Sequence, residues 1–436
     1  MEIIKKLSKK ILSRIPKGFS AQVDVISTTT TSLRFGNNAI TQNSIGDKIN
    51  ISLEVFQGKK HGSSSTNRLD IDALDRLVSV ATNIAMQTPE DPEAMPLLDP
   101  QAYPETPQRF FQDTADLSPN DIVEHISIVT EMAKSKGMSA GGLYQTGIVK
   151  KVLANNHGLS AEDSFTHVEY SCSVSGKTGS GYANATAESI NAIEPEALAR
   201  RAFATAVASE NPKNIGPGDY DVVLTPQAVI DLLEYFNYYL SRRDADEGTN
   251  AFAGKLGEKV FADSINISVG QLDPEMPPPP FSDDGLPVKP TFWVKNGVLD
   301  RLPMSRFWAK EKGDTPDAIK WPFTLGGTDS TVEELIEQCG NGLFIQRFWY
   351  IEEVDARDML LTGMTRDGVF AIENGKIAGP VKNLRFNESP MVALANAVAL
   401  GKAVRVGSYF SEPHYWAKVP AILSREFTFS SSTESV

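Results

Sequence analysis

Apolar residues recur at helical spacing in four stretches of the first half of the chain. Ile3, Ile4, Leu7, Ile11, Leu12 and Ile15 lie on one side of a first helix, with lysines between them. Asp70 can cap a second helix that extends to about Gln87. A third helix follows Ser118-Pro119 and stops near Gly137, and a fourth spans 194–208. The pattern therefore predicts helices at regular intervals through the first 210 residues.

Between these helices the pattern changes to alternating and β-branched residues, which predicts strands. The predicted strands cover 22–27, 32–35, 39–44, 49–56, 142–156 and 164–175. Residues 88–107 hold six prolines and are predicted to form an irregular connector. The order helix, strands, helix, connector, helix, strands, helix suggests two similar halves within this region.

A cluster of Gly, Pro and Asn at 212–218 marks the predicted domain boundary. Beyond it we expect a strand at 220–225 and helices at 226–242, 332–339 and 390–400, with a proline-rich connector at 276–280. Asn296-Gly297 and Asn374-Gly375 each lie between apolar residues, which is a strong hairpin signal. The sequence thus predicts an α+β fold of two domains. Residues 1–215 form a mixed α/β domain, and residues 216–436 form a mainly antiparallel, barrel-like β domain with flanking helices.

Charge and composition restrict the classes of partner. The 42 basic and 55 acidic residues give a net charge of −13, which argues against direct binding to nucleic-acid backbones. No run approaches the roughly 18 apolar residues of a membrane-spanning helix, and the first residues do not form a signal peptide. The two cysteines are too few for a secreted disulfide scaffold. We therefore expect a cytoplasmic protein without a membrane anchor.

Local motifs for catalysis are absent or weak. The five histidines show no HExxH or HxH spacing, which are the spacings that place two zinc ligands together. The segment 175–181 contains Gly-Lys-Thr but lacks the first glycine of a phosphate-binding loop, so we predict that this segment is a hairpin turn. Asp244, Asp246 and Glu247 form an acidic cluster after two arginines. Such carboxylates can serve acid–base chemistry or bind a hard cation, but a solvated helix end explains them as well.

A series of segments with a characteristic order and spacing covers nearly the whole chain, at residues 34–35, 39–44, 221–226, 248, 251–260, 265–267, 272–274, 283–287, 296–299 and 372–377. This series resembles the TldD/PmbA family, also called the modulator-of-DNA-gyrase family. The resemblance implies the two-domain fold of that family. Residues 272–274 replace a more acidic run of the family, which suggests a divergent member.

The family has two branches, and the resemblance implies the branch without zinc. TldD-type chains carry HExxxH on the helix after a Leu-x-Pro strand, and a later cysteine. Here that helix reads Gln227 to Phe236 without histidine, and residues 408–416 contain no cysteine. The chain is therefore similar to TldE (PmbA) subunits. The resemblance implies a non-catalytic subunit without a cofactor of its own, which pairs with a zinc-bearing TldD-type subunit to degrade or process unfolded peptides.

Two alternatives remain open at the level of sequence. The first is a homodimeric peptidase with a divergent site, built from Asp244, Asp246, Glu247 and His414; these residues also serve as candidates for a peptide cleft. The second is a stand-alone peptide-binding module, lined by aromatic residues at 348–350, 409–410 and 415–416, although core packing explains these residues at least as well. The sequence does not identify the peptide, and it does not distinguish a heterodimer from a homodimer.

Overall fold

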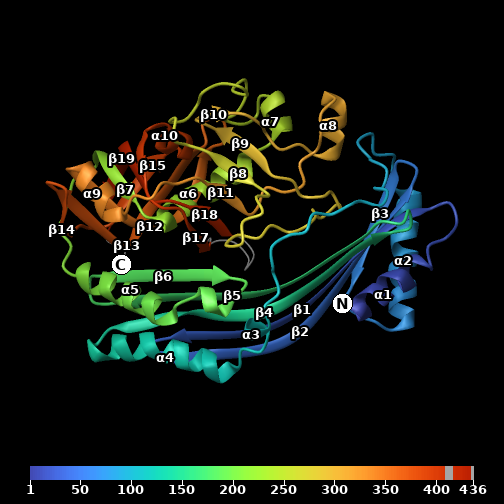
Figure 1. Ribbon diagram of the computed structural model, residues 1–436, viewed down its shortest axis with the longest axis horizontal. Coiled ribbons are helices and arrows are strands. Elements are labelled where there is room, and N and C mark those ends of the chain that lie inside the picture. The colour runs from blue at the N-terminus through green and yellow to red at the C-terminus, as the bar shows by residue number, and fades with distance from the viewer. Residues whose placement is uncertain (408–415, 434–436) are drawn as a thin grey trace.

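The computed structural model describes residues 1–407 and 416–433, in which a long sheet carries a second, more compact half of the chain (Figure 1). The sheet belongs to residues 1–210 and has the strand order β3-β2-β1-β4-β5-β6, with every neighbouring pair antiparallel. Its strands are β1 (Ser20–Gly36), β2 (Ala39–Gln57), β3 (Lys60–Thr66), β4 (Ser139–Asn155), β5 (Ser160–Ser175) and β6 (Ser180–Ala187).

The helices of this half are α1 (Glu2–Leu12), α2 (Ile71–Gln87), α3 (Gln112–Ala115), α4 (Pro119–Ser135) and α5 (Pro195–Ala208), with a 3₁₀ turn η1 (Ile190–Ala192). Four of these helices begin within one residue or so of where the sequence predicts, and the short helix α3 and the turn η1 were not predicted. Asp70 caps α2 by accepting a hydrogen bond from the Ala73 amide, and Ser118 and Asp121 form a capping box at α4. The predicted connector at 88–107 is confirmed as irregular, and in the structure it extends to residue 111 without helix or strand.

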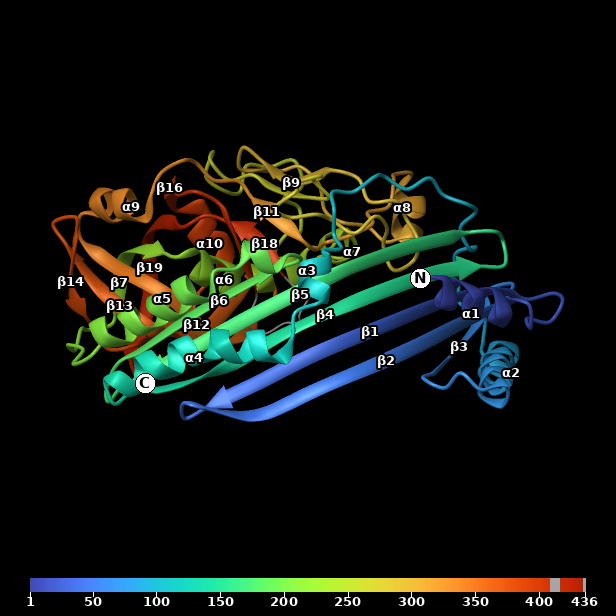
Figure 2. The same cartoon turned by 60° about the horizontal axis from the view of Figure 1, so that its bottom comes forward.

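The two faces of the sheet have different roles because successive residues of a strand point to opposite sides. On β1, Val23 and Val25 pack against α1 and α2, while Leu33 and Phe35 pack against α4 and α5. These odd-numbered residues share one face, so the four helices cover that face at its two ends (Figure 2). The other face of the sheet is left to the second half of the chain.

The first half consists of two similar units, as the order of predicted elements suggests. Residues 2–87 and 119–208 each run helix, three strands, helix, and the units meet where β1 pairs with β4. A glycine on each outer strand, Gly62 on β3 and Gly181 on β6, lies against the final helix of its unit. Gly62 pairs with Val55 as the third residue pair from its turn, and Gly181 pairs with Val174 as the second pair from its turn.

The second half contains a closed ring of strands. The ring runs β12-β7-β19-β15-β13 and closes because β13 also pairs with β12. A second sheet has the order β10-β9-β8-β11-β18-β17. The pairs β7–β12 and β11–β18 are parallel and the other strand pairs of this half are antiparallel, so the predicted barrel-like β domain is confirmed.

Helices pack around and between these two sheets. Apolar residues of α6 join the ring and the second sheet in one core, which includes Phe236, Trp293 and Phe348. The strands of this half are β7 (Gly218–Leu224), β8 (Ile267–Val269), β9 (Thr291–Lys295), β10 (Val298–Leu299), β11 (Phe323–Leu325), β12 (Gly342–Asp355), β13 (Leu360–Glu373), β14 (Lys376–Pro380), β15 (Leu384–Glu388), β16 (Ala397–Leu400), β17 (Val404–Gly407), β18 (Trp416–Val419) and β19 (Ile422–Ser432). The helices are α6 (Pro226–Tyr239), α7 (Arg242–Asp246), α8 (Arg306–Lys312), α9 (Val332–Cys339) and α10 (Pro390–Ala395).

Turn chemistry is confirmed at the two Asn-Gly hairpins. Asn296 and Asn374 have φ angles of 51° and 50°, and the glycines that follow have 76° and 73°. Positive φ at both central residues defines the type I′ turn, which matches the twist of the flanking strands. The segment 175–180 is likewise a turn between β5 and β6.

Two predicted helix ends are wrong. The helix expected at 226–242 stops at Tyr239, because Ser241 accepts a hydrogen bond from the Asp244 amide and so caps α7. The helix expected at 390–400 stops at Ala395, and Ala397–Leu400 forms strand β16 against β19. Pairing with a neighbouring strand outweighs local propensity here. Across residues 1–407 and 416–433, every helix is too short or too polar to cross a membrane.

The close approach of β6 to α5 makes a stability prediction. A methyl group at Gly181 would lie 2.1 Å from the Ala202 carbonyl oxygen and 2.6 Å from the Ala206 nitrogen. Gly181→Ala therefore requires the helix to move, and we expect it to lower the free energy of unfolding by about 1–3 kcal/mol in urea titrations. Gly46→Ala is the control because that position faces open space in β2. Equal stability of the two variants would contradict the packing described.

Candidate functional site between the two halves

Two neighbouring cavities lie between the uncovered face of the long sheet and the second half; together we call them the central cleft. The aromatic cavity, of about 580 Å³, is lined by Phe165, Phe281, Trp321 and Trp416 among others. The arginine cavity, of about 780 Å³, is lined by Arg201, Arg347 and Arg405 among others. The Arg405 guanidinium stacks on the Trp416 ring at 4.4 Å, so this pair lies between the two cavities.

The first turn of α6 forms part of the wall of the arginine cavity. Thr225 caps this helix by accepting a hydrogen bond from the Ala228 amide at 3.3 Å, and its own hydroxyl donates to the Gln346 carbonyl at 2.6 Å. Pro226 takes the first helical position, where a missing N–H costs nothing. These contacts attach the start of α6 to β12 and place Gln227 in the cavity wall.

Asp231, one turn further along α6, is fully enclosed by protein. Its carboxylate accepts hydrogen bonds from the Gln227 side-chain amide at 2.8 Å and from the Phe348 backbone amide at 2.9 Å. Burial raises the pKa of Asp231 to about 7, although nearby Arg347 and these two hydrogen bonds act in the opposite direction. Asp231 thus holds the helix against β12, and Gln227 holds the Asp231 carboxylate in place.

Arg347 joins the two halves at the floor of the arginine cavity. Its guanidinium lies 4.1 Å from the Tyr182 ring of β6 and 4.8 Å from the Trp349 ring of its own strand. It also forms an ion pair with Asp367 at 3.5 Å, and only 2% of the residue is exposed. Stacking on aromatic faces and pairing with a carboxylate are the environments that allow a guanidinium to be buried.

Other cations of the cleft also have carboxylate partners. Arg405 of β17 pairs with Glu188, which directly follows β6. Arg109, in the segment before α3, pairs with Asp163 of β5. The two pairs therefore attach these segments to the long sheet. Glu188 and Arg405 are largely buried, with side-chain exposures of 4% and 12%. Such pairs hold the walls of the cleft in place more than they add net stability.

The structure brings the predicted acidic residues together on α7, at the surface rather than in a closed site. Burial opposes ionisation of Asp246, but hydrogen bonds from Lys312, Arg242 and Trp308 lower its pKa to about 2. Glu247 pairs with Arg243 at 2.9 Å. Asp244 acts electrostatically on Lys320, which lines the aromatic cavity. His414 lies outside the described residues, so a joint site with the acidic cluster remains a prediction.

Metal-ligating groups do not gather elsewhere in the part of the chain that the structure describes. Within residues 1–407 and 416–433, no three His, Cys, Asp or Glu side chains are placed to hold a metal ion. Both cysteines are buried and free, with Cys339 at the end of α9. Sequence reasoning missed the cleft arginines, because residues 201, 347 and 405 come from separate elements and no local motif joins them.

Comparison with known proteins places the chain in a family. Sequence models of the PmbA/TldA metallopeptidase match in three parts: domain 1 at residues 21–85, the central domain at 113–210, and the C-terminal domain at 217–431. The chain is 22% identical to Metalloprotease PmbA of Escherichia coli O157:H7 over 90% of its length and 89% of that protein. It is also 22% identical to the Metalloprotease PmbA homolog of Haemophilus influenzae, over 80% of each chain.

Solved structures share the fold. TldE from Thermococcus kodakarensis superposes with a TM-score of 0.86 at 16% identity, covering 98% of this chain and 99% of that one. A Thermotoga maritima protein described as a modulator of a DNA gyrase gives 0.87 at 20% identity, covering 98% and 100%. The fold and the family models define a metallopeptidase-related protein of two halves. The chain belongs to the PmbA/TldD family.

The buried carboxylate on α6 makes a prediction about pH. The folded chain binds the Asp231 proton more tightly than the unfolded chain, whose carboxyl has a pKa near 3.8. The free energy of unfolding should therefore fall as pH rises from about 4 to about 7, by at most about 4 kcal/mol from this group. Urea titrations across that range should show this slope in the wild type and a smaller slope in Asp231→Asn.

Asp246→Asn is the matched control, because the pKa of that carboxyl is lowered rather than raised. Its contribution to stability is present above about pH 4 and is lost as pH falls toward 2, so the slope has the opposite sign. Parallel pH profiles for the wild type and Asp231→Asn would contradict the assignment of a proton to Asp231.

Proposed function

We propose that this chain is the non-catalytic, TldE-type subunit of a TldD/TldE-like zinc metallopeptidase, which degrades or processes unfolded peptides in the cytoplasm. In this role the chain binds no zinc of its own and needs a TldD-type subunit that supplies the metal. The central cleft contributes the wall along which an extended peptide lies. Acid–base or metal chemistry within the chain is not required.

The proposal depends on which residues α6 carries where the catalytic branch has its zinc motif. The family resemblance places the HExxxH zinc motif of the catalytic branch on the corresponding helix. In this chain the helix has no histidine, and its first two polar residues, Gln227 and Asp231, bond to each other, while Asp231 also accepts from the Phe348 amide. An inward, protein-enclosed carboxylate cannot act as a ligand to an ion in the cleft without leaving those donors. The relatives named Metalloprotease PmbA and TldE support the same assignment.

The shape of the cleft supports peptide binding. It combines aromatic faces with hydrogen-bonding side chains in a volume of several hundred cubic ångströms, as ligand sites commonly do. Its position between the two halves makes both of them necessary for the site. A surface of this kind can hold a peptide even though the reacting groups belong to another subunit.

The test compares zinc content and peptide hydrolysis for this chain, for a TldD-type chain from the same source, and for their mixture. We expect substoichiometric zinc in this chain alone and hydrolysis that rises at least about tenfold in the mixture over the TldD-type chain alone. The physical reason is that the TldD-type chain supplies the metal, which lowers the pKa of an attacking water toward the neutral range, while this chain adds the wall that holds the peptide. Zinc is measured by elemental analysis and hydrolysis with an unfolded, fluorescence-quenched peptide.

His414→Ala separates the proposal from the divergent-site alternative. Under the proposal, the variant leaves the hydrolysis of the mixture unchanged. Stoichiometric zinc in the isolated chain, together with hydrolysis that this substitution abolishes, would overturn the proposal in favour of a homodimeric peptidase. Peptide binding without any association with a TldD-type chain would favour the stand-alone module.

A further inference from the structure

Each cavity of the central cleft contains one cation that has no carboxylate partner among the described residues. The arginine cavity contains Arg201, and the aromatic cavity contains Lys320. No carboxylate oxygen of the described chain lies within 4.0 Å of either cation, whereas the other cations of the cleft form ion pairs. We propose that the cleft selects peptides bearing carboxylates, and that Arg201 and Lys320 are the residues that receive them.

Arg201 is placed so that a ligand can reach it. It projects from α5, and its Nη2 donates to the backbone carbonyl of Asn184 at 3.3 Å. The Asn184 side chain in turn donates to the Gly407 carbonyl at 3.1 Å, which ties β6 to β17 beside the cavity. The Arg201 side chain is exposed to solvent within the cavity. The protein around the cavity still displaces part of the water near the guanidinium, and this desolvation lowers the pKa of Arg201. A guanidinium with remaining donors in a partly desolvated cavity suits a carboxylate.

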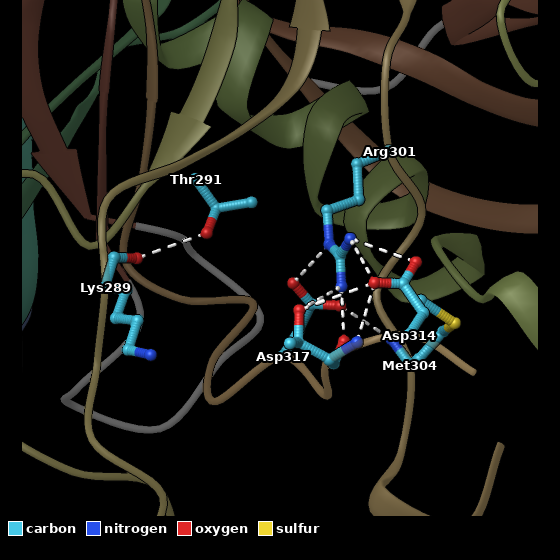
Figure 3. Close-up of polar contacts among 7 residues, drawn as sticks. Lys289, Thr291, Arg301, Met304, Asp314 and Asp317 are labelled. Carbon is cyan, nitrogen blue, oxygen red and sulfur yellow. Dashed lines mark hydrogen bonds and ion pairs between the residues drawn. The ribbon is translucent and has the colours of Figure 1, made fainter. Parts of the chain in front are cut away.

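Lys320 lies in the wall of the aromatic cavity, and hydrogen bonds position the loop that precedes it. Arg301 donates to Asp317 at 2.8 Å and to Asp314 at 3.3 Å, while the Met304 amide donates to Asp317 at 3.0 Å (Figure 3). These bonds fix the loop that leads into Lys320. Burial lowers the pKa of Lys320, and Asp244 opposes this only from beyond ion-pair distance. An incoming carboxylate would offset that cost of burial.

The remaining charges of the cleft limit where a carboxylate can bind. Glu188, Asp163 and Asp367 are each occupied by a cleft arginine. Glu194 and Glu333 also line the arginine cavity, but both are exposed to solvent, where water screens them. Single carboxylates at Arg201 and Lys320 are therefore favoured over a polyanion, which the other acidic groups would repel.

The carboxylate can come from a Glu or Asp side chain or from the C-terminus of the peptide, and the test distinguishes these sources. The inference rests on the proposed peptide-binding role of the chain. The probe is a fluorescent, unfolded ten-residue peptide in three forms. One carries two glutamates and an amidated C-terminus, one carries glutamines in their place with the same amide, and one carries glutamines with a free C-terminal carboxylate.

Binding to the full chain is measured by fluorescence anisotropy at low and high ionic strength. We expect the glutamate or the free-carboxylate form to bind about tenfold more tightly than the neutral form at low salt, and the preference to shrink at high salt. Arg201→Gln and Lys320→Gln should each reduce the preference by about threefold, because two equal contributions multiply to about tenfold. Neutral-peptide affinity should change little in either variant.

Two cations outside the cleft supply matched controls. Arg200→Gln removes the same charge from the same helix, but Arg200 pairs with Glu196 on the exposed side of α5. Lys310→Gln removes an exposed lysine of α8. Both controls should keep the wild-type preference, and thermal unfolding of all four variants checks that each is folded.

The outcomes are separable. Equal binding of all three peptides to the wild type, or loss of preference in the controls as well, would overturn the inference and leave the peptide-binding role intact. Failure of every peptide to bind would overturn both. A preference confined to the free-carboxylate form assigns the C-terminus as the source, and one confined to the glutamate form assigns the side chains.

Discussion

The burial of the Arg347 guanidinium is the constraint on which the assembly of the two halves depends. Taking an isolated charge out of water costs several kcal/mol or more, so the chain must surround it with compensating groups. Asp367 supplies the opposite charge, and the Tyr182 ring covers one face of the guanidinium. Tyr182 belongs to the long sheet and Asp367 to the ring of strands. The second half therefore rests on the uncovered face of the sheet in one orientation, and that orientation defines the central cleft.

The same requirement for compensation explains the chemistry of α6. Asp231 lies within electrostatic reach of Arg347, but its two hydrogen-bond donors are Gln227 and the Phe348 amide. The Gln227 contact lies within the helix, and the Phe348 amide contact links the helix to β12, next to the buried arginine. The enclosed carboxylate on this helix therefore has both of its hydrogen-bond donors within the protein. The wall of the cleft at this point is thus structural, and the cleft cations without a carboxylate partner among the described residues lie on α5 and on the loop before β11.

Local signals in the sequence were sufficient for elements whose ends are set by neighbouring residues. Asp70 and Ser118 fix helix starts by bonding to amides three positions later, and Asn296-Gly297 fixes a hairpin through positive φ angles. The ring closure and the cleft required contacts that no local pattern carries. Phe348 and Asp231 are 117 positions apart, and the strand at 397–400 depends on pairing with β19. Helix propensity alone predicted one helix over 390–400, because the strand that pairs with 397–400 is β19, which comes later in the chain.

The distribution of charge reconciles an acidic protein with a cleft that contains several cations. A net charge of −13 describes the surface as a whole and opposes the approach of polyanions over long distances. Inside the cleft, a carboxylate of the chain neutralises each of Arg109, Arg347 and Arg405. These residues therefore hold the walls in position but contribute little net positive potential. What remains is positive charge at single positions, separated by the Arg405–Trp416 stack. Such an arrangement suits a flexible chain with isolated negative groups, because each group can reach one cation while aromatic faces hold the apolar residues between them.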